Sequence, residues 1–144
     1  MQAFHGTAAL FTALNVASRG SLTACPGAEL ATFFALDLAE ARYYAGLSAE
    51  QLADDGEEID ERILVCEIAE GLNLLVLDGE DVDEDDDLYG LIEDDRKALR
   101  HARIKGFDGV SWPQGNATNA GATVAIFDLD HVEVVRIHRD RKAA

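Results

Sequence analysis

Short runs of residues that favour strands recur along the chain and alternate with stretches of helical spacing. They lie at 1–5, 62–68, 72–77, 110–112, 123–128 and 131–137. Such runs, bounded by Gly, Pro, Asn and Asp, predict strands. No repeat or low-complexity linker interrupts the alternation, and 144 residues are enough to bury a substantial core. We therefore expect one domain, residues 1–144, that mixes strands and helices, with the last two runs paired as a hairpin around Leu129-Asp130.

Three ranges between the strands have helical character: 8–16, 48–54 and 86–105. The second half of the last range is rich in Lys and Arg. These bases complement the helix dipole, so they need no nucleic-acid explanation. Gly106 is expected to end this helix. Asp108 follows in a Gly-Phe-Asp-Gly sequence and is expected to form the turn there.

The range 30–45 is ambiguous. Its apolar spacing fits one continuous helix, but Asp37 and Glu40 also form a capping pair, which is typical of a helix that begins between them. We favour a break, with 32–35 extended and a helix that begins at Leu38.

Acidic residues are strongly concentrated in the middle of the chain, whose net charge is −16. Of the 28 acids, 20 lie between Glu50 and Asp95, where Arg62 is the only base. An acidic surface segment is expected at about 78–95, and its densest part is 80–87. Phosphate binding needs Lys and Arg, so direct binding of nucleic acid is disfavoured and a basic protein partner is favoured. The alternative is a solvated loop that keeps the protein soluble.

Several kinds of site and location are disfavoured by the sequence. No apolar run reaches the roughly 20 residues of a membrane span, and the first residues do not resemble a secretion signal. We expect a soluble, cytoplasmic protein that does not bind membranes. Cys25 and Cys66 lie far apart and are interpreted as buried thiols in a reducing compartment. The four His residues have no metal-ligand spacing, so no metal site is expected.

The tripeptide His5-Gly6-Thr7 follows the first strand-like run. Glycine lets the backbone approach a ligand closely, and the neighbouring imidazole and hydroxyl can form hydrogen bonds with that ligand. Packing alone is expected to explain this tripeptide poorly. The alternative is the end of a strand that contains an incidental histidine.

Four further motifs follow the tripeptide in a fixed order. They are Phe34-Ala35 ahead of Asp37, Ala41-Arg42-Tyr43-Tyr44-Ala45, Gly106-Phe107-Asp108-Gly109-Val110, and Val124-Ala125-Ile126-Phe127-Asp128. Over most of the chain, this order resembles the ADP-ribosyltransferase superfamily in its diphtheria-toxin-like branch. The resemblance implies an α+β fold of the split β-sandwich kind, in which small, mostly antiparallel sheets are flanked by helices.

The resemblance also implies an activity. Members of the superfamily use NAD⁺ as a substrate, and this chain would be an enzyme that transfers ADP-ribose to an intracellular protein. Some phage-encoded members inactivate CRISPR complexes. Small size and strong acidity fit a phage or bacterial effector that acts on a basic, nucleic-acid-binding protein.

Individual residues receive roles from the resemblance. His5 and Thr7 would bind the ribose next to adenine, and the backbone of Gly6 would hold the nicotinamide amide. Phe34 and Tyr44 would line the nicotinamide pocket, where aromatic faces suit a cationic ring. Tyr44 is in addition a candidate catalytic residue. The alternative for both aromatic residues is ordinary core packing.

The glutamate that such transferases use beside their last strands is missing from the sequence. No acid lies between Trp112 and Phe127. Gln114 is the catalytic candidate that we favour in its place, because it is the longest neutral side chain of that loop and follows Pro113. Otherwise an acid from elsewhere, such as Glu29, fills the gap, or catalysis is lost. In the last case the protein would be a non-catalytic acidic inhibitor of a basic partner.

Overall fold

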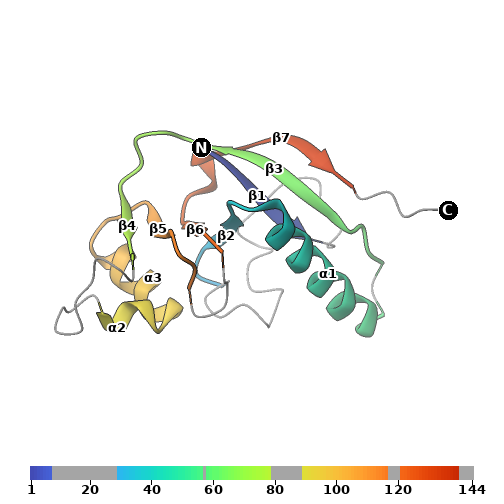
Figure 1. Ribbon diagram of the computed structural model, residues 1–144, viewed down its shortest axis with the longest axis horizontal. Coiled ribbons are helices and arrows are strands. Elements are labelled where there is room, and N and C mark those ends of the chain that lie inside the picture. Colours follow the sequence, from blue (N-terminus) through green and yellow to red (C-terminus); the bar gives the residue numbers. More distant parts are fainter. Residues whose placement is uncertain (8–28, 57, 79–88, 117–120, 140–144) are drawn as a thin grey trace.

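The computed structural model describes residues 1–7, 29–56, 58–78, 89–116 and 121–139 (Figure 1). Within them, the strands are β1 (Gln2–Thr7), β2 (Thr32–Ala35), β3 (Arg62–Ile68), β4 (Leu74–Val76), β5 (Gly109–Trp112), β6 (Thr123–Ile126) and β7 (Val132–His138). They form a sheet in the order β4-β5-β6-β2-β1-β3-β7, with all neighbours antiparallel except β4 and β5, which are parallel. The protein is a mixed fold of helices and a mostly antiparallel sheet, compatible with the expected α+β class.

The sheet is nearly divided between β2 and β1. These strands share one registered pair, Phe4 with Ala35, whereas β1 pairs with β3 over six residues and β2 with β6 over four. The expectation of separate small sheets is therefore wrong, because the described strands form one continuous sheet. Its two halves, β4-β5-β6-β2 and β1-β3-β7, nevertheless meet at that single pair. We call this place the junction.

The described helices are α1 (Leu38–Asp54), α2 (Tyr89–Ile92), α3 (Asp95–Ile104) and the 3₁₀ turn η2 (Leu129–His131). The predicted break before α1 is confirmed. Asp37 is extended and caps the helix, and its carboxylate accepts hydrogen bonds from the backbone N–H of Ala39 at 2.7 Å and of Glu40 at 3.3 Å. These contacts satisfy N–H groups that have no partner inside the helix.

Two predictions about helix boundaries are wrong. The separate helix at 48–54 is part of α1, which continues past Ser48 because the surrounding Ala, Leu, Glu and Gln favour helix and no proline interrupts it. The single helix predicted at 86–105 is divided in the described residues, because Asp94 adopts extended φ and ψ angles of −136° and 101°. Its carboxylate accepts from the N–H of Lys97 and caps α3.

The predicted hairpin at the end of the chain is also wrong. β6 lies inside the sheet between β5 and β2, whereas β7 lies at the edge beside β3. The chain changes direction between them at η2, where the carboxylate of Asp128 accepts a hydrogen bond from the N–H of Asp130 at 2.9 Å. All four residues of β6 are buried, so this strand needs a partner on each side.

Glycines follow the ends of two helices, and Gly106 does so as predicted. Gly56 follows α1 with a φ of 75°, and Gly106 follows α3 with a φ of 82°. Both angles lie in the left-handed region that glycine adopts without strain. The predicted helix at 8–16, the acidic cluster at 80–87 and Cys25 lie outside the described residues.

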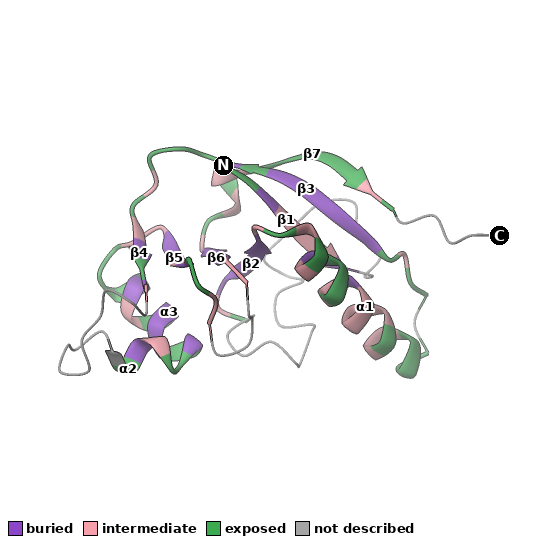
Figure 2. Ribbon diagram, in the orientation of Figure 1, coloured by how far each residue is buried: buried purple, intermediate pink, exposed green. Residues whose placement is uncertain are grey.

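Both helical groups cover the same face of the sheet. On β2, Phe33 packs against the cluster that contains α3, and Ala35 packs with Ala41 of α1. Residues two apart on a strand point to the same face. The opposite face carries a separate buried cluster around Phe34 and Leu64. Figure 2 shows the resulting pattern, with the buried residues concentrated in the strands and on the inner sides of the helices.

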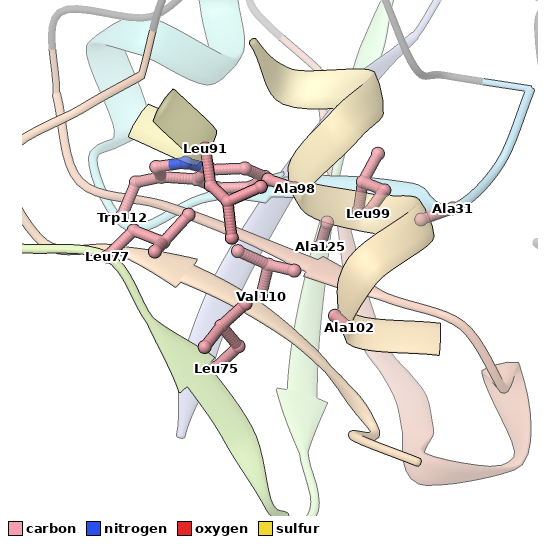
Figure 3. Packing of buried hydrophobic residues seen from close by; sticks show 10 residues of the cluster. All are labelled: Ala31, Leu75, Leu77, Leu91, Ala98, Leu99, Ala102, Val110, Trp112 and Ala125. Carbon is pink, nitrogen blue, oxygen red and sulfur yellow. The ribbon is translucent and has the colours of Figure 1, made fainter. Parts of the chain in front are cut away.

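The largest buried cluster of the described residues includes the indole of Trp112 and joins α2 and α3 to β4, β5 and β6 (Figure 3). Its members are Ala31, Leu75, Leu77, Leu91, Ala98, Leu99, Ala102, Val110, Trp112 and Ala125. Phe33 meets the indole edge-on, with 6.0 Å between ring centroids. This core therefore supports the half of the sheet that contains β2 and β6.

Replacing the cap of α1 should weaken the fold without altering its core. Asp37→Ala is expected to lower the free energy of unfolding by about 1 kcal/mol, because two helix N–H groups lose their acceptor. Urea unfolding monitored by circular dichroism measures the change. Asp37→Asn is the matched control, since its amide oxygen also caps, and it should stay within a few tenths of a kcal/mol of the wild type. An equal loss in both variants would contradict the capping role.

Candidate functional site

The side chain of His5 spans the junction where β1 and β2 part. Its Nδ1 lies 2.8 Å from the backbone oxygen of Phe33. A carbonyl oxygen can only accept, so Nδ1 carries the proton and donates it. The imidazole thus bonds to the carbonyl of Phe33, which lies two residues before Ala35 on β2. At this point the registered pairing between β1 and β2 has ended. The His5 ring also lies 5.7 Å from the ring of Phe34.

The surroundings of His5 favour its neutral form. Burial lowers the pKa of the imidazole below its ordinary value of 6.5, and the positive charge of Arg62 lowers it further, while the bond to Phe33 acts in the opposite direction. At neutral pH the ring is therefore uncharged. With Nδ1 protonated, Nε2 of the neutral ring is a hydrogen-bond acceptor.

Gly6 is required by the packing of α1. A Cβ built on this residue would collide with the backbone oxygen of Ala41 and lie 2.8 Å from the nitrogen of Ala45. The helix can lie this close to β1 only because residue 6 has no side chain. The expectation that packing explains the tripeptide poorly is therefore wrong for Gly6. Its role at nicotinamide stays a prediction, as does that of the buried Thr7.

The two predicted aromatic residues lie on different elements and different faces. Phe34 is fully buried beside His5 in the cluster opposite the helices, so the alternative of core packing describes it well. Tyr44 lies on the turn of α1 that covers Gly6, with its ring centroid 5.5 Å from that of Tyr43. The structure therefore brings Phe34 to His5, and Tyr44 to the helix turn above Gly6.

Glu40 is a candidate that sequence reasoning missed. Its Oε1 accepts a hydrogen bond from the N–H of Gly121 at 2.9 Å, just before β6. Its Oε2 has essentially no accessible surface, and no donor from the described residues reaches it. A Cβ on Gly121 would lie 2.5 Å from this oxygen, so a larger residue there would require the Glu40 carboxylate to shift. The next residue, Ala41, lies against Gly6 on the face of the sheet opposite to the side chain of His5.

The capping motif concealed this role in the sequence. In a complete capping box the acid three residues after the cap bonds back to the backbone N–H of the cap residue. Here Asp37 caps α1 as expected, but Glu40 bonds to Gly121, which is 81 residues away along the chain. The motif therefore located the helix correctly and gave no sign of the distant contact.

The other sequence candidates for the missing acid lie elsewhere. Gln114 is exposed in the turn that follows β5. Glu29 bonds to Arg96 of α3 at 2.8 Å, and its pKa is lowered by a backbone hydrogen bond first and by Arg96 second. Asp108 accepts a hydrogen bond from the N–H of Asn73 at 2.8 Å, a contact between distant parts of the chain, and its expected part in a local turn stays a prediction.

Other kinds of site find little support among the described residues. No group of three potential metal ligands occurs there. Burial raises the pKa of the Cys66 thiol to about 12, so this thiol is unreactive at neutral pH. A small cavity of about 50 Å³ lies on another flank of α1, far below the roughly 300 Å³ at which ligand pockets begin. Its lining residues are Arg42, Ala45, Glu61, Arg62, Ile63 and His138.

The candidate site is thus the junction and the first turns of α1 above it. It contains one neutral imidazole, one buried carboxylate oxygen and aromatic side chains on both faces of the sheet. None of the helices in the described ranges has the length and apolar character of a membrane span. No protein-family model, no curated protein and no solved structure matches this chain.

Proposed function

We propose that the protein is a mono-ADP-ribosyltransferase with an ADP-ribosyltransferase-like fold, which uses NAD⁺ to modify an intracellular protein. The observation that carries the proposal is the arrangement of His5. Its Nδ1–H is fixed by Phe33, its ring is neutral, and its Nε2 can accept a hydrogen bond from a ligand hydroxyl. A ribose offers such a hydroxyl.

The form of the sheet supports the same proposal. Although the described strands form one continuous sheet, its two halves meet at one residue pair, and in this proposal they correspond to the two sheets of a split β-sandwich. In the proposed complex the adenine-side ribose meets His5 and Thr7, and nicotinamide lies near the backbone of Gly6. Tyr44 lies on the helix turn that covers Gly6, and in this proposal it flanks that ring.

The reaction replaces one bond at the ribose carbon that carries nicotinamide. The glycosidic bond to nicotinamide breaks, a bond to a nucleophilic side chain of the target forms, and the proton of that side chain passes to solvent. Positive charge develops on the ribose in the transition state. The protein's contribution is to hold the dinucleotide and the target in the orientation that the reaction needs, and to stabilise that charge.

The target is proposed to be basic. The net charge of −16 favours association with a positively charged protein and disfavours direct contact with nucleic acid. The same charge supports a second candidate function, in which the protein blocks a basic partner without catalysis. Incubation with NAD⁺ separates the two, because only a transferase releases nicotinamide in the presence of its target.

Binding of NAD⁺ should depend on His5 through Nε2. His5→Asn keeps a side-chain N–H that can donate to Phe33 but removes the second nitrogen. Its affinity for NAD⁺ should fall by about five- to tenfold, the value of one hydrogen bond of about 1 kcal/mol. Isothermal titration calorimetry measures the affinity, and His101→Asn on α3 is the control.

His5→Ala should in addition lose stability, by about 1–3 kcal/mol, because the Phe33 carbonyl loses its donor. A wild-type protein that does not bind NAD⁺ would refute the proposed function. If His5→Asn binds NAD⁺ as tightly as the wild type, Nε2 of His5 does not contact the ligand.

A further inference from the structure

Strand β7 lies at the edge of the sheet and is the most exposed of the described strands. Five of its seven residues are exposed, whereas six of the seven residues of its neighbour β3 are buried, a contrast that Figure 2 shows. Its side chains Val134, Val135 and Ile137 are 37%, 50% and 45% exposed. Apolar surface gathered in one place marks an interaction site, and a sheet edge also presents N–H and C=O groups to which another strand can bond.

A β-bulge sorts the side chains of β7 between the two faces of the sheet. Arg136 lies opposite Val65 and Val134 lies opposite Cys66, so Val135 is an extra residue in the ladder. Directly opposed residues point to the same face. The face on which α1 packs therefore receives the polar side chains of β7, which are Glu133, Arg136 and His138. The other face receives the apolar ones, which are Val132, Val134 and Ile137.

The bulge also brings two opposite charges to one face. Glu133 and Arg136 are three residues apart, and in a regular strand they would point to opposite faces. In β7 both point to the face of α1, and both are exposed. Neither forms an ion pair with another of the described residues. The strand thus presents one acid and one base side by side, with a row of apolar side chains on the reverse.

A second copy of β7 running antiparallel is complementary to this arrangement. A two-fold axis perpendicular to the sheet keeps the corresponding faces of both copies together. If Val134 lies opposite itself on this axis and Val135 again stays outside the ladder, Glu133 of each copy lies opposite Arg136 of the other. On the reverse face, Val132 of each copy then lies opposite Ile137 of the other. Opposite charges and apolar side chains in such positions stabilise a pair of strands.

Protection of the edge is the competing explanation, because charges and bulges at an edge commonly prevent pairing. The charges of β7 are nevertheless balanced, with one acid, Glu133, and one arginine, Arg136. The following Arg139 is neutralised by Asp60, to which it bonds at 2.8 Å. A net charge of −16 opposes association over most of the surface, but this strand is locally close to neutral and matches its own copy.

We propose that the protein forms a symmetric dimer in which the β7 strands of two copies pair antiparallel around Val134 and join the two sheets into one. The inference goes beyond the proposed function and does not depend on it. In the sheet order, β3 and β1 separate β7 from the junction, so the dimer contact and the candidate site are distinct parts of the molecule.

The test exchanges charges across the two-fold axis. Sedimentation velocity is measured over a protein concentration series for the wild type, Glu133→Arg and Arg136→Glu. The wild type should form a concentration-dependent dimer with a micromolar or weaker Kd, because an interface of two strands is small. Each single variant places like charges opposite each other at both pairs of the dimer. Its Kd should therefore rise at least about tenfold.

Two combinations should restore the dimer. The variant that carries both Glu133→Arg and Arg136→Glu keeps two pairs of opposite charge, so its Kd should return to within about threefold of the wild type. An equimolar mixture of the two single variants should form a heterodimer, since every pair again joins opposite charges. These rescues are specific to the proposed register, because no other register places position 133 opposite position 136.

The apolar row is tested separately. Val134→Lys places two ammonium groups together at the two-fold axis, and its Kd should rise at least about tenfold. Val76→Lys is the matched control, since Val76 is 53% exposed on β4 at the other edge of the sheet, and it should leave Kd unchanged. Circular dichroism monitors folding. The charge variants change exposed side chains only and should melt close to the wild type, even if Val134→Lys does not fold.

The outcomes decide between a dimer and a protected edge. Loss of the dimer in both single variants, with rescue in both combinations, supports the proposal. A wild type that stays monomeric throughout the series overturns it, as does loss without rescue. Any assembly that survives the single charge changes also overturns it, because the copies would then meet at another surface. None of these measurements uses NAD⁺, so a negative result leaves the transferase proposal intact.

Discussion

Gly6→Ala is expected to abolish the native packing of α1 against the sheet. The added methyl group would meet the backbone oxygen of Ala41, which cannot rotate away as a side chain does. The helix must shift as a body, and this should cost at least about 3 kcal/mol, at the upper end of overpacking effects. Domains of this size are stable by about 5–15 kcal/mol, so the variant should be partly unfolded or melt far earlier.

Gly46→Ala is the control for this result. It makes the same change on α1 itself, where the nearest atom to the new Cβ is a carboxylate oxygen of Glu61 at 3.6 Å. This variant should be more stable than the wild type by up to about 1 kcal/mol, because alanine favours helix over glycine. Thermal melting of the two variants side by side is the measurement. Similar melting temperatures would show that α1 does not rest on Gly6.

Trp112→Ala is expected to cost about 3–5 kcal/mol, the range for removing a large buried aromatic side chain. The indole has no exposed surface and belongs to the largest buried cluster. Trp112→Phe should cost far less, within about 1 kcal/mol of the wild type, for a reason particular to this site. The indole Nε1–H is buried and has no acceptor among the described residues. Replacing the indole by a phenyl ring therefore loses packing contacts but also removes an unsatisfied donor.

Urea unfolding of the two Trp112 variants measures the difference. Ile104→Ala on α3 is the control for a change at the surface, since that side chain is 83% exposed, and it should be nearly neutral. If Trp112→Phe proved as costly as Trp112→Ala, the packing of the larger ring would outweigh its unpaired N–H.

Local chemistry in the sequence predicted most elements of the described fold. Asp37 located the start of α1 and the extended residues before it, and Gly106 located the end of α3. In both places the signal acts over a few residues, through a side chain or a backbone angle. The prediction failed at Ser48, where helix propensity on both sides outweighed a weak start signal.

Contacts between distant parts of the chain were not predictable in this way. The runs now seen as β6 and β7 are adjacent in sequence, which suggested a hairpin, but each strand is paired with strands from other parts of the chain. Glu40 and Gly121 show the same limit within the candidate site. Their contact depends on how α1 and β6 come together, and neither residue carries a local sign of it.

The single residue pair at the junction has a mechanical consequence. With so little backbone ladder between them, the two halves of the sheet are held across the gap partly by the bond from the His5 side chain to Phe33. In addition, α1 packs on Gly6 of β1 and is tied to the stretch before β6 by the bond between Glu40 and Gly121. Both bonds therefore oppose separation of the two halves at the junction. The resistance of the sheet to bending at this place depends on side-chain bonds more than on the backbone ladder. A ligand that replaced the bond from His5 to Phe33 would thereby change how firmly the two halves are joined.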